Sequence, residues 1–189
     1  MKPVSIEEIK NIAEYELERP EFRARMMALK DRRRVRVGPH LTFLFENRET
    51  VRYQIQEMVR IERLVKPEEI RHEVETYNEL IPGENELSAS LLIEYETPEV
   101  RAVWLPKLLG LEDHVWIEVE GAGRAKARFD ARQIATDRIS AVQYVKFPMT
   151  GEQAAGLGRG AKIVVDHPEY AAEAVLTDTQ IAELEQDFA

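Results

Sequence analysis

The middle of the first half of the chain alternates apolar and polar residues at helical spacing. A helix drawn through residues 47–65 gathers its apolar side chains on one stripe, because successive residues turn by about 100°. The stripe contains Val51, Ile55, Met58 and Val65. Asn47 precedes it, and its side chain can accept hydrogen bonds from the free N–H groups of a first turn. The pattern predicts an amphipathic helix that begins just after Asn47.

Glu62 falls inside this stripe, between the directions of Ile55 and Met58. A carboxylate on a buried face must be paired, or its pKa must rise until it is neutral. We therefore expect Glu62 to be largely buried and bonded to an arginine. The alternative is a polar pocket built around this carboxylate, with Gln54 and Arg48 at the edges of the stripe.

Other helices are indicated by the same periodicity. Ser5 and Glu8 have the spacing of a capping box, which predicts a helix over residues 6–18. Pro20 is expected to end it, because proline lacks an N–H and clashes with the preceding turn. A short helix should follow Pro20, and two more are predicted at residues 68–80 and after Thr177.

Shorter alternating segments are typical of strands. They span residues 35–37, 41–45, 88–95, 115–119, 125–129, 142–147, 163–165 and 171–176. Short turns rich in glycine and proline join many of them and favour antiparallel pairing. We predict an α+β protein in which N-terminal helices pack with a C-terminal antiparallel β-sheet or partly closed barrel.

The domain organisation follows from the same change of pattern. Residues 1–85 form a mainly helical half with one strand segment near 35–45, and residues 86–189 form a β-rich half with a C-terminal helix. The two halves are either separate or one integrated domain, since 189 residues suit both arrangements.

Composition narrows the function classes. A net charge of −9 argues against nucleic acid or an anionic membrane as partner. The absence of cysteine excludes disulfides, thiolate catalysis and thiolate metal sites. No apolar signal core or membrane span is visible, so we expect a cytoplasmic protein. Base rates alone favour a homodimer.

A basic run from Lys30 to Arg36 stands out in this acidic chain. It indicates either a binding site for an anion or a partner, or arginines that form ion pairs with carboxylates of neighbouring helices. Together with the polar residues in and just before the helix predicted over residues 47–65, this run supplies the candidate binding cluster. The candidates are Glu46, Arg48, Gln54, Glu57, Glu62, Arg32, Arg33 and Arg34.

Metal binding has only weak candidates. Glu69 and His72 have the Glu-x-x-His spacing of carboxylate-bridged di-iron bundles, but the chain contains no second such motif. His72 also points away from the apolar stripe of its helix. His167, before a proline, most simply belongs to a turn with a hydrogen-bonding imidazole. We expect no metal and no cofactor.

Several motifs together resemble one bacterial family. They are RRVRVGP at residues 33–39, FENR at 45–48, QIQEM at 54–58, YNELIP at 77–82, LSASLLIE at 87–94 and DHPEY at 166–170. The family is catalogued as domain of unknown function 3501, and the resemblance covers nearly the whole chain. It implies no activity. It implies an association, since members are often encoded beside rubrerythrin-like and iron–sulphur oxidoreductase-like proteins.

Three classes of function follow. The first, which we favour, is an accessory or binding protein that works with a redox or peroxide-stress partner. The second is an enzyme that uses Glu62, Glu57 or His167 as acid or base, with arginines for an anionic substrate. The third is a metalloprotein that joins carboxylates to His72, His114 or His167.

Overall fold

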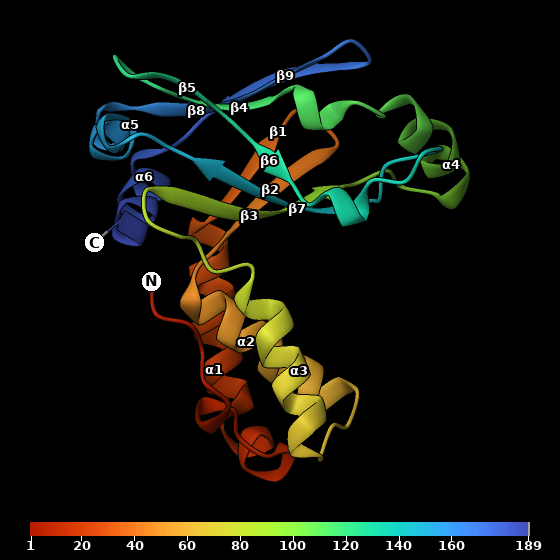
Figure 1. Ribbon diagram of the computed structural model, residues 1–189, viewed down its shortest axis with the longest axis vertical. Coiled ribbons are helices and arrows are strands. Elements are labelled where there is room, and N and C mark those ends of the chain that lie inside the picture. The colour runs from red at the N-terminus through yellow and green to blue at the C-terminus, as the bar shows by residue number, and fades with distance from the viewer. Residues whose placement is uncertain (189) are drawn as a thin grey trace.

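The computed structural model describes residues 1–188, which form helices at the N-terminal side and two β-sheets beyond them (Figure 1). The helices are α1 Ile12–Arg32, α2 Arg48–Ile61, α3 Pro67–Asn78, α4 Pro98–Lys107, α5 Gly151–Gly156 and α6 Asp178–Leu184. The strands are β1 Arg34–Val37, β2 Leu41–Glu46, β3 Glu86–Ile93, β4 Val115–Val119, β5 Gly123–Lys126, β6 Arg128–Phe129, β7 Val142–Pro148, β8 Ala161–His167 and β9 Tyr170–Val175. Short 3-10 helices include Ile6–Glu8, Ala131–Gln133 and Glu185–Phe188.

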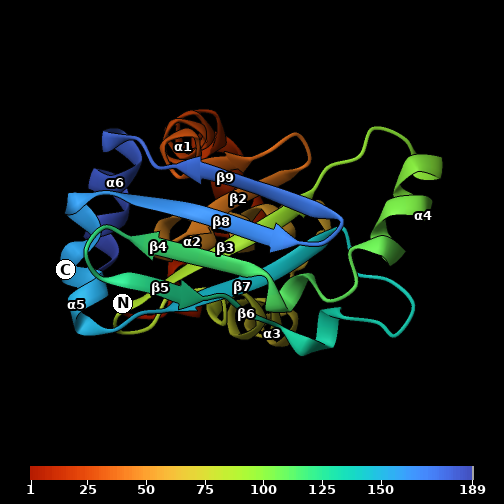
Figure 2. The ribbon, with the colours of Figure 1, turned by 90° about the horizontal axis from the view of Figure 1, so that it is seen from above.

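The strands form two antiparallel sheets. The five-stranded sheet has the order β1-β2-β3-β7-β6, and the four-stranded sheet has the order β5-β4-β8-β9. Seen from above, the four-stranded sheet lies across the five-stranded one, with α5 and α6 at one end and α4 at the other (Figure 2). The predicted α+β class is confirmed, as two packed sheets without closure into a barrel. Among residues 1–188 no helix is long and apolar enough to cross a membrane.

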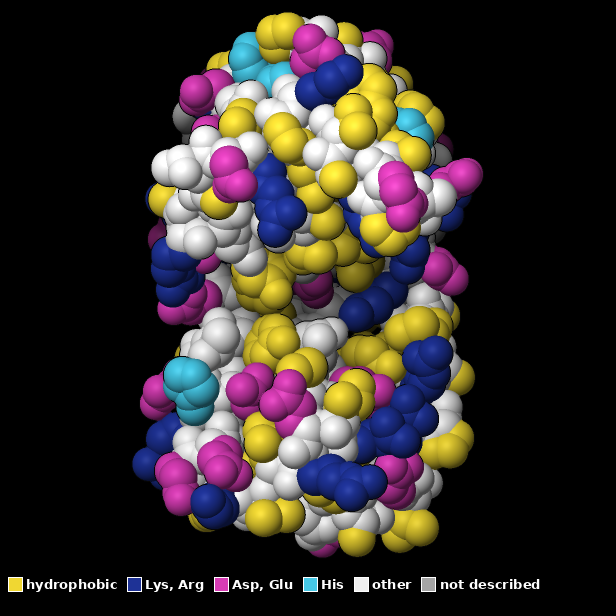
Figure 3. Space-filling model, turned by 90° about the vertical axis from the view of Figure 1, so that its right-hand side faces the viewer, with side chains coloured by type: hydrophobic (Ala, Val, Ile, Leu, Met, Phe, Trp, Pro, Cys, Tyr) yellow, Lys and Arg dark blue, Asp and Glu magenta, His cyan; other side chains and the backbone are white. Residues whose placement is uncertain are grey.

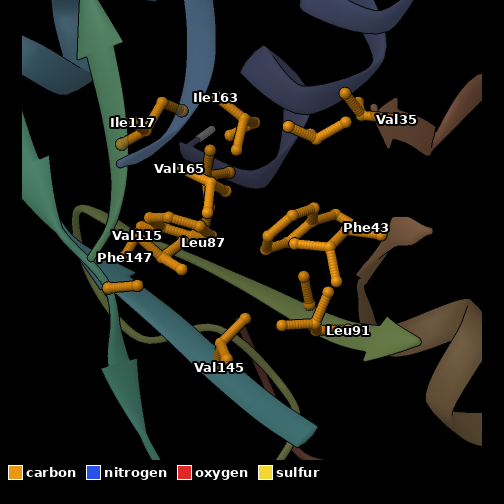
Figure 4. Close-up of a cluster of buried hydrophobic side chains, with 14 of the residues drawn as sticks. Val35, Phe43, Leu87, Leu91, Val115, Ile117, Val145, Phe147, Ile163 and Val165 are labelled. Atoms are coloured by element: carbon orange, nitrogen blue, oxygen red, sulfur yellow. The ribbon is translucent and has the colours of Figure 1, made fainter. Parts of the chain in front are cut away.

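The main hydrophobic core lies between the two sheets (Figure 4). Phe43 and Phe147 of the five-stranded sheet are fully buried, as are Ile117 and Ile163 of the facing sheet. Because side chains alternate across a strand, the odd-numbered residues of β2, β3 and β7 point into this core. Their even-numbered neighbours face the other way, toward the helices.

The helices form a second, smaller core beneath the five-stranded sheet. Val51, Ile55 and Val59 of α2 are buried there together with Val74 of α3. The predicted stripe is therefore correct for Val51 and Ile55, whereas Met58 is half-buried and Val65 is exposed beyond the helix end. Asn47 caps the helix as expected by accepting from the backbone N–H groups of Glu49 and Thr50. Strand β2 pairs with β3, so the hydrogen bonds of one sheet cross the predicted boundary at residue 85.

The N-terminal helix differs from its prediction. The capping box of Ser5 and Glu8 is present, but it opens only a 3-10 turn, and α1 begins at Ile12 after the N-cap Asn11. The helix then continues through Pro20, although proline was expected to end it. Pro20 lies on the exposed side, so the backbone carbonyl freed by its missing N–H can be solvated. Tyr15 and Arg19 before the proline and Arg23 after it contact side chains of α2 and hold the helix on both sides of Pro20.

Arg33 connects the first strands to the C-terminal segment. Its side chain is fully buried, and its guanidinium donates to the backbone carbonyls of Phe45 and Glu46 at distances of 2.9 and 3.2 Å. The same group pairs with Asp187 and lies 3.6 Å from the carboxylate of Glu183. Burial raises the pKa of Asp187, against the attraction of Arg33. The guanidinium therefore compensates a carboxylate that water cannot reach.

At its centre the basic run of residues 30–36 therefore has a structural role. This agrees with the interpretation in which its arginines pair with carboxylates of other segments. The prediction that Arg33 belongs to an anion-binding surface is wrong, because the residue is fully buried between β2 and the C-terminal segment. Arg32 pairs with Glu183 at 3.0 Å, and the backbone carbonyl of Arg34 accepts from Gln180 at 2.6 Å.

We expect Arg33→Met to lower the free energy of unfolding by about 3–5 kcal/mol, since it leaves the buried carboxylate of Asp187 without a cation. Arg32→Met is the matched control. The Arg32 side chain is 45% exposed, so losing its ion pair should cost less than about 1 kcal/mol. Urea denaturation of the two variants measures the difference. Equal effects would contradict the role assigned to Arg33.

Candidate functional site

A cleft separates the helices from the five-stranded sheet. Figure 3 shows it as a hollow waist with hydrophobic side chains on both walls and an acidic side chain in its depth. It contains an outer cavity of about 530 Å³ and an inner cavity of about 220 Å³. Tyr77, Leu80 and Tyr144 line both cavities, so the two spaces adjoin.

Glu46 lies at the end of β2 and lines the inner cavity. Its side chain accepts a hydrogen bond of 2.6 Å from the Thr50 hydroxyl and one of 2.7 Å from the Ser90 hydroxyl. The even-numbered register explains the meeting, since Glu46 pairs with Ser88 across β2 and β3 and its side chain lies beside Ser90. Glu46 is only 6% exposed. A buried carboxylate is thereby held in a fixed position at the cavity wall.

Two tyrosines and an amide surround the same space. Burial raises the pKa of Tyr144, and the nearby charge of Glu46 raises it further. Burial also raises the pKa of Tyr77, while the Gln54 side chain beside its phenol acts in the opposite direction. Both phenols therefore stay protonated at neutral pH, and they can donate hydrogen bonds as well as present ring faces.

The outer cavity is bordered by ion pairs. At one end Glu86 accepts from Lys146 at 2.8 Å and lies 3.4 Å from Arg128. At the other, Arg132 pairs with Asp130 beside it and reaches Glu79 at the end of α3, at 2.5 Å. The Arg132–Glu79 contact joins the sheet side of the cleft to the helix side.

The candidate residues of the sequence fall into separate places. Glu46 and Gln54 line the inner cavity together. Arg48 instead binds Glu8 through two contacts of 2.5 and 2.6 Å, near the N-terminal turn. Arg32, Arg33 and Arg34 lie toward the C-terminal segment. They line neither cavity of the cleft.

Glu57 forms a tight group between α1 and α2. Its carboxylate accepts a hydrogen bond of 2.6 Å from the Tyr15 hydroxyl and two hydrogen bonds of 2.8 and 3.0 Å from the Arg19 guanidinium. Burial acts to raise the pKa of Glu57, but these hydrogen bonds outweigh it and the pKa is lowered. With both oxygens occupied by protein donors, Glu57 holds two helices together.

The prediction that Glu62 is buried beside an arginine is wrong. Helix α2 ends at Ile61, and Glu62 is its exposed C-cap residue. Arg63 then adopts a positive φ of 55°, which turns the chain away from the helix axis. The periodicity that placed Glu62 on the stripe does not continue past the helix end. Within residues 1–188, no Lys, Arg or His nitrogen lies within 4.0 Å of its carboxylate.

The metal candidates do not assemble. His72 is exposed on α3, and Glu69 pairs with Lys66 at 3.3 Å. The buried His167 contacts the Leu109 carbonyl through Nε2 and accepts from the Glu169 N–H at Nδ1, as expected for an imidazole in a turn. The described residues contain no group of three or more histidine, aspartate or glutamate side chains placed to hold a metal ion.

Sequence reasoning missed several lining residues. Ser90 and Tyr144 were assigned only to strands, and Tyr77 only to the helix predicted over residues 68–80. A usable signal was present in β7, where Tyr144 and Lys146 alternate with the buried residues Val145 and Phe147. Two polar-tipped side chains on one face of a strand indicate a surface different from the sandwich core.

These features define a class of protein: two packed antiparallel sheets and an N-terminal helical layer that enclose a cleft with a buried carboxylate. The chain belongs to the family described as "Protein of unknown function (DUF3501)", whose model matches residues 3–188. The family resemblance predicted from the motifs is confirmed.

A solved structure supports the same assignment. The chain is similar to a novel protein of unknown function from Burkholderia pseudomallei K96243, whose crystal structure was determined at 1.90 Å resolution. The two are 31% identical over 100% of both chains, with a TM-score of 0.93. No curated protein matches. Neither the family nor the solved structure carries a stated activity, so the function is argued from the cleft.

Glu57→Gln should lower the free energy of unfolding by about 2 kcal/mol at pH 7, because Arg19 and Tyr15 lose a charged acceptor. The lowered pKa sets the pH dependence. The stabilisation by the Glu57 carboxylate is fully present at pH values above 4.5, the ordinary pKa of a glutamate, and is lost as the pH falls through the lowered pKa of the folded state. The gap between wild type and variant should therefore shrink below pH 4.5. Urea denaturation at several pH values measures it.

Glu16→Gln is the control for this prediction. Glu16 also joins α1 to α2, through Arg60 at 2.6 Å, but its side chain is 47% exposed. Screening by water should keep its effect below about 1 kcal/mol at every pH. A Glu57 variant that behaves like the Glu16 variant would contradict the role of Glu57 in holding α1 and α2 together.

Proposed function

We propose that the protein is an accessory binding protein that holds a small organic molecule in the cleft between α2, α3 and the five-stranded sheet. One observation carries this proposal: the fixed, buried carboxylate of Glu46 lines a cavity whose wall also contains the apolar side chains of Leu44, Val51, Leu80 and Leu92. Binding sites for small molecules combine apolar walls with a few placed polar groups in this way.

The size of the cleft agrees with this function. The larger cavity, of about 530 Å³, falls in the range of pockets for small ligands, and the adjoining cavity of about 220 Å³ extends it. The apolar walls come from Leu44, Val51, Leu80, Leu92 and Val142, and the polar groups come from Glu46, Gln54, Ser90, Lys30 and the two tyrosines. A molecule with a polar head and an apolar body fits such a distribution.

Catalysis by the acids and bases expected from the sequence has less support. Glu57 is bound to Arg19 and Tyr15, Glu62 is exposed at a helix end, and both ring nitrogens of His167 contact the backbone. The three do not share a cavity. The rubrerythrin-like or iron–sulphur oxidoreductase-like partner implied by the family resemblance stays a prediction, and the cleft proposal does not depend on it.

The proposal is tested by filling the inner cavity. Val142 lines it from β7 and is 39% exposed, so Val142→Trp should occupy the space with little effect on stability. Native mass spectrometry of protein purified from its natural host should show a bound small molecule on the wild type. The bound mass should be absent from the Val142→Trp variant.

Val175→Trp is the matched control, because it makes the same change at a valine of β9 that is 71% exposed and lines neither cavity of the cleft. It should keep the bound mass. A wild-type protein without any bound small molecule, or a Val142→Trp variant that retains it, would contradict binding in this cleft.

A further inference from the structure

Among residues 1–188, every buried carboxylate except one is paired with a lysine or an arginine. Each of four is paired with a cation: Glu57 with Arg19, Glu86 with Lys146, Glu183 with Arg32 and Asp187 with Arg33. Glu46 is the fifth, and within residues 1–188 no Lys, Arg or His nitrogen lies within 4.0 Å of its carboxylate. Its two partners are the neutral hydroxyls of Thr50 and Ser90.

Neutral hydroxyls leave the charge of Glu46 uncompensated. A carboxylate offers about four acceptor positions, and two hydroxyl donors occupy only part of them. Removing an ionised carboxylate from water is costly unless an opposite charge replaces the solvent. Glu46 lines the inner cavity, so the missing cation can come from a bound molecule.

Building on the binding function above, we infer that the ligand of the cleft carries a positively charged amine or ammonium head, which is bound by Glu46 in the inner cavity. The rings of Tyr77 and Tyr144 line the same cavity, and aromatic faces attract organic cations. The apolar side chains of Leu80, Leu92 and Val142 contact the organic part next to the head. The rest of the molecule extends into the outer cavity.

Among the described residues that line the inner cavity, Lys30 is the one cation that competes with such a head. It lines the inner cavity, but its ammonium group lies over the ring of Tyr53, 5.2 Å from the ring centre. Its ammonium group is not within 4.0 Å of the Glu46 carboxylate, so it does not form an ion pair with this group. Lys30 also distinguishes the two signs of ligand charge, because an anionic head would use Lys30 and a cationic head would be repelled by it.

The experiment uses three probes with the same ring and different heads: 2-phenylethylamine, 2-phenylethanol and phenylacetate. Their dissociation constants are measured on the full chain by titration calorimetry or ligand-detected NMR at pH 7. The protonated amine should bind the wild type at least about tenfold more tightly than the alcohol, and phenylacetate should bind most weakly. Val142→Trp should abolish amine binding.

Glu46→Gln keeps the shape of the side chain and removes its charge. It should weaken amine binding about tenfold or more and leave the alcohol unchanged. Glu94→Gln is the matched control, because Glu94 also accepts from a hydroxyl, that of Thr42 at 2.6 Å, but lines neither cavity of the cleft. It should change no affinity by more than about twofold. Lys30→Met should leave amine binding unchanged or tighten it.

Several results would overturn the inference. Alcohol or phenylacetate binding that equals amine binding would do so, as would amine binding that Glu46→Gln leaves intact or Lys30→Met weakens. These outcomes leave binding in the cleft standing, whereas the absence of all probe binding together with an empty native protein overturns both proposals. If Glu46→Gln does not fold, the three probes on the wild type and on Val142→Trp decide the question.

Discussion

The structure depends on one buried guanidinium. Arg33 donates to the carbonyls at the end of β2 and, on its other side, meets the carboxylates of Glu183 and Asp187. A fully buried arginine is tolerated only where its donors are satisfied and its charge is balanced. Both conditions are met by joining strand β2 to the C-terminal segment. The backbone of Glu46 is thereby fixed from one side while Thr50 and Ser90 hold its side chain from the other.

The site arises because the five-stranded sheet is covered on both faces. Every residue of β2 is buried, but the odd-numbered positions enter the sandwich core and the even-numbered positions face the helices. Glu46 and Ser90 can therefore line the inner cavity of the cleft while Phe45 and Leu91, one residue away, pack among hydrophobic side chains. The alternation of side chains along a strand separates the two environments without a separate loop or domain.

The sequence was informative where a local rule decides the structure. Asn47 and Thr177 are N-caps of helices, and alternating segments became strands, because capping and strand alternation involve only near neighbours. Pro20 shows the limit of such rules, since tertiary contacts through Tyr15 and Arg19 support a helix that local preference would end.

The cleft was beyond such rules. Glu46, Ser90 and Tyr144 come from three strands, and their meeting is set by the register of β2 with β3 and of β3 with β7. The prediction that Glu62 is buried failed for a related reason. The helical pattern was extended to Val65, although the helix ends at Ile61, where no proline or glycine marks its end. Arg33 was visible as a basic residue, but its partner Asp187 lies 154 positions along the chain.

That separation has a consequence for synthesis. A ribosome adds roughly 5–20 residues per second, so Arg33 leaves the peptidyl-transferase centre on the order of ten seconds before Asp187 is made. Throughout that interval the nascent β2 end lacks the acid that balances its guanidinium. The ion pair that joins the end of β2 to the C-terminal segment can consequently form only after residue 187 has been made, long after the first two strands were synthesised.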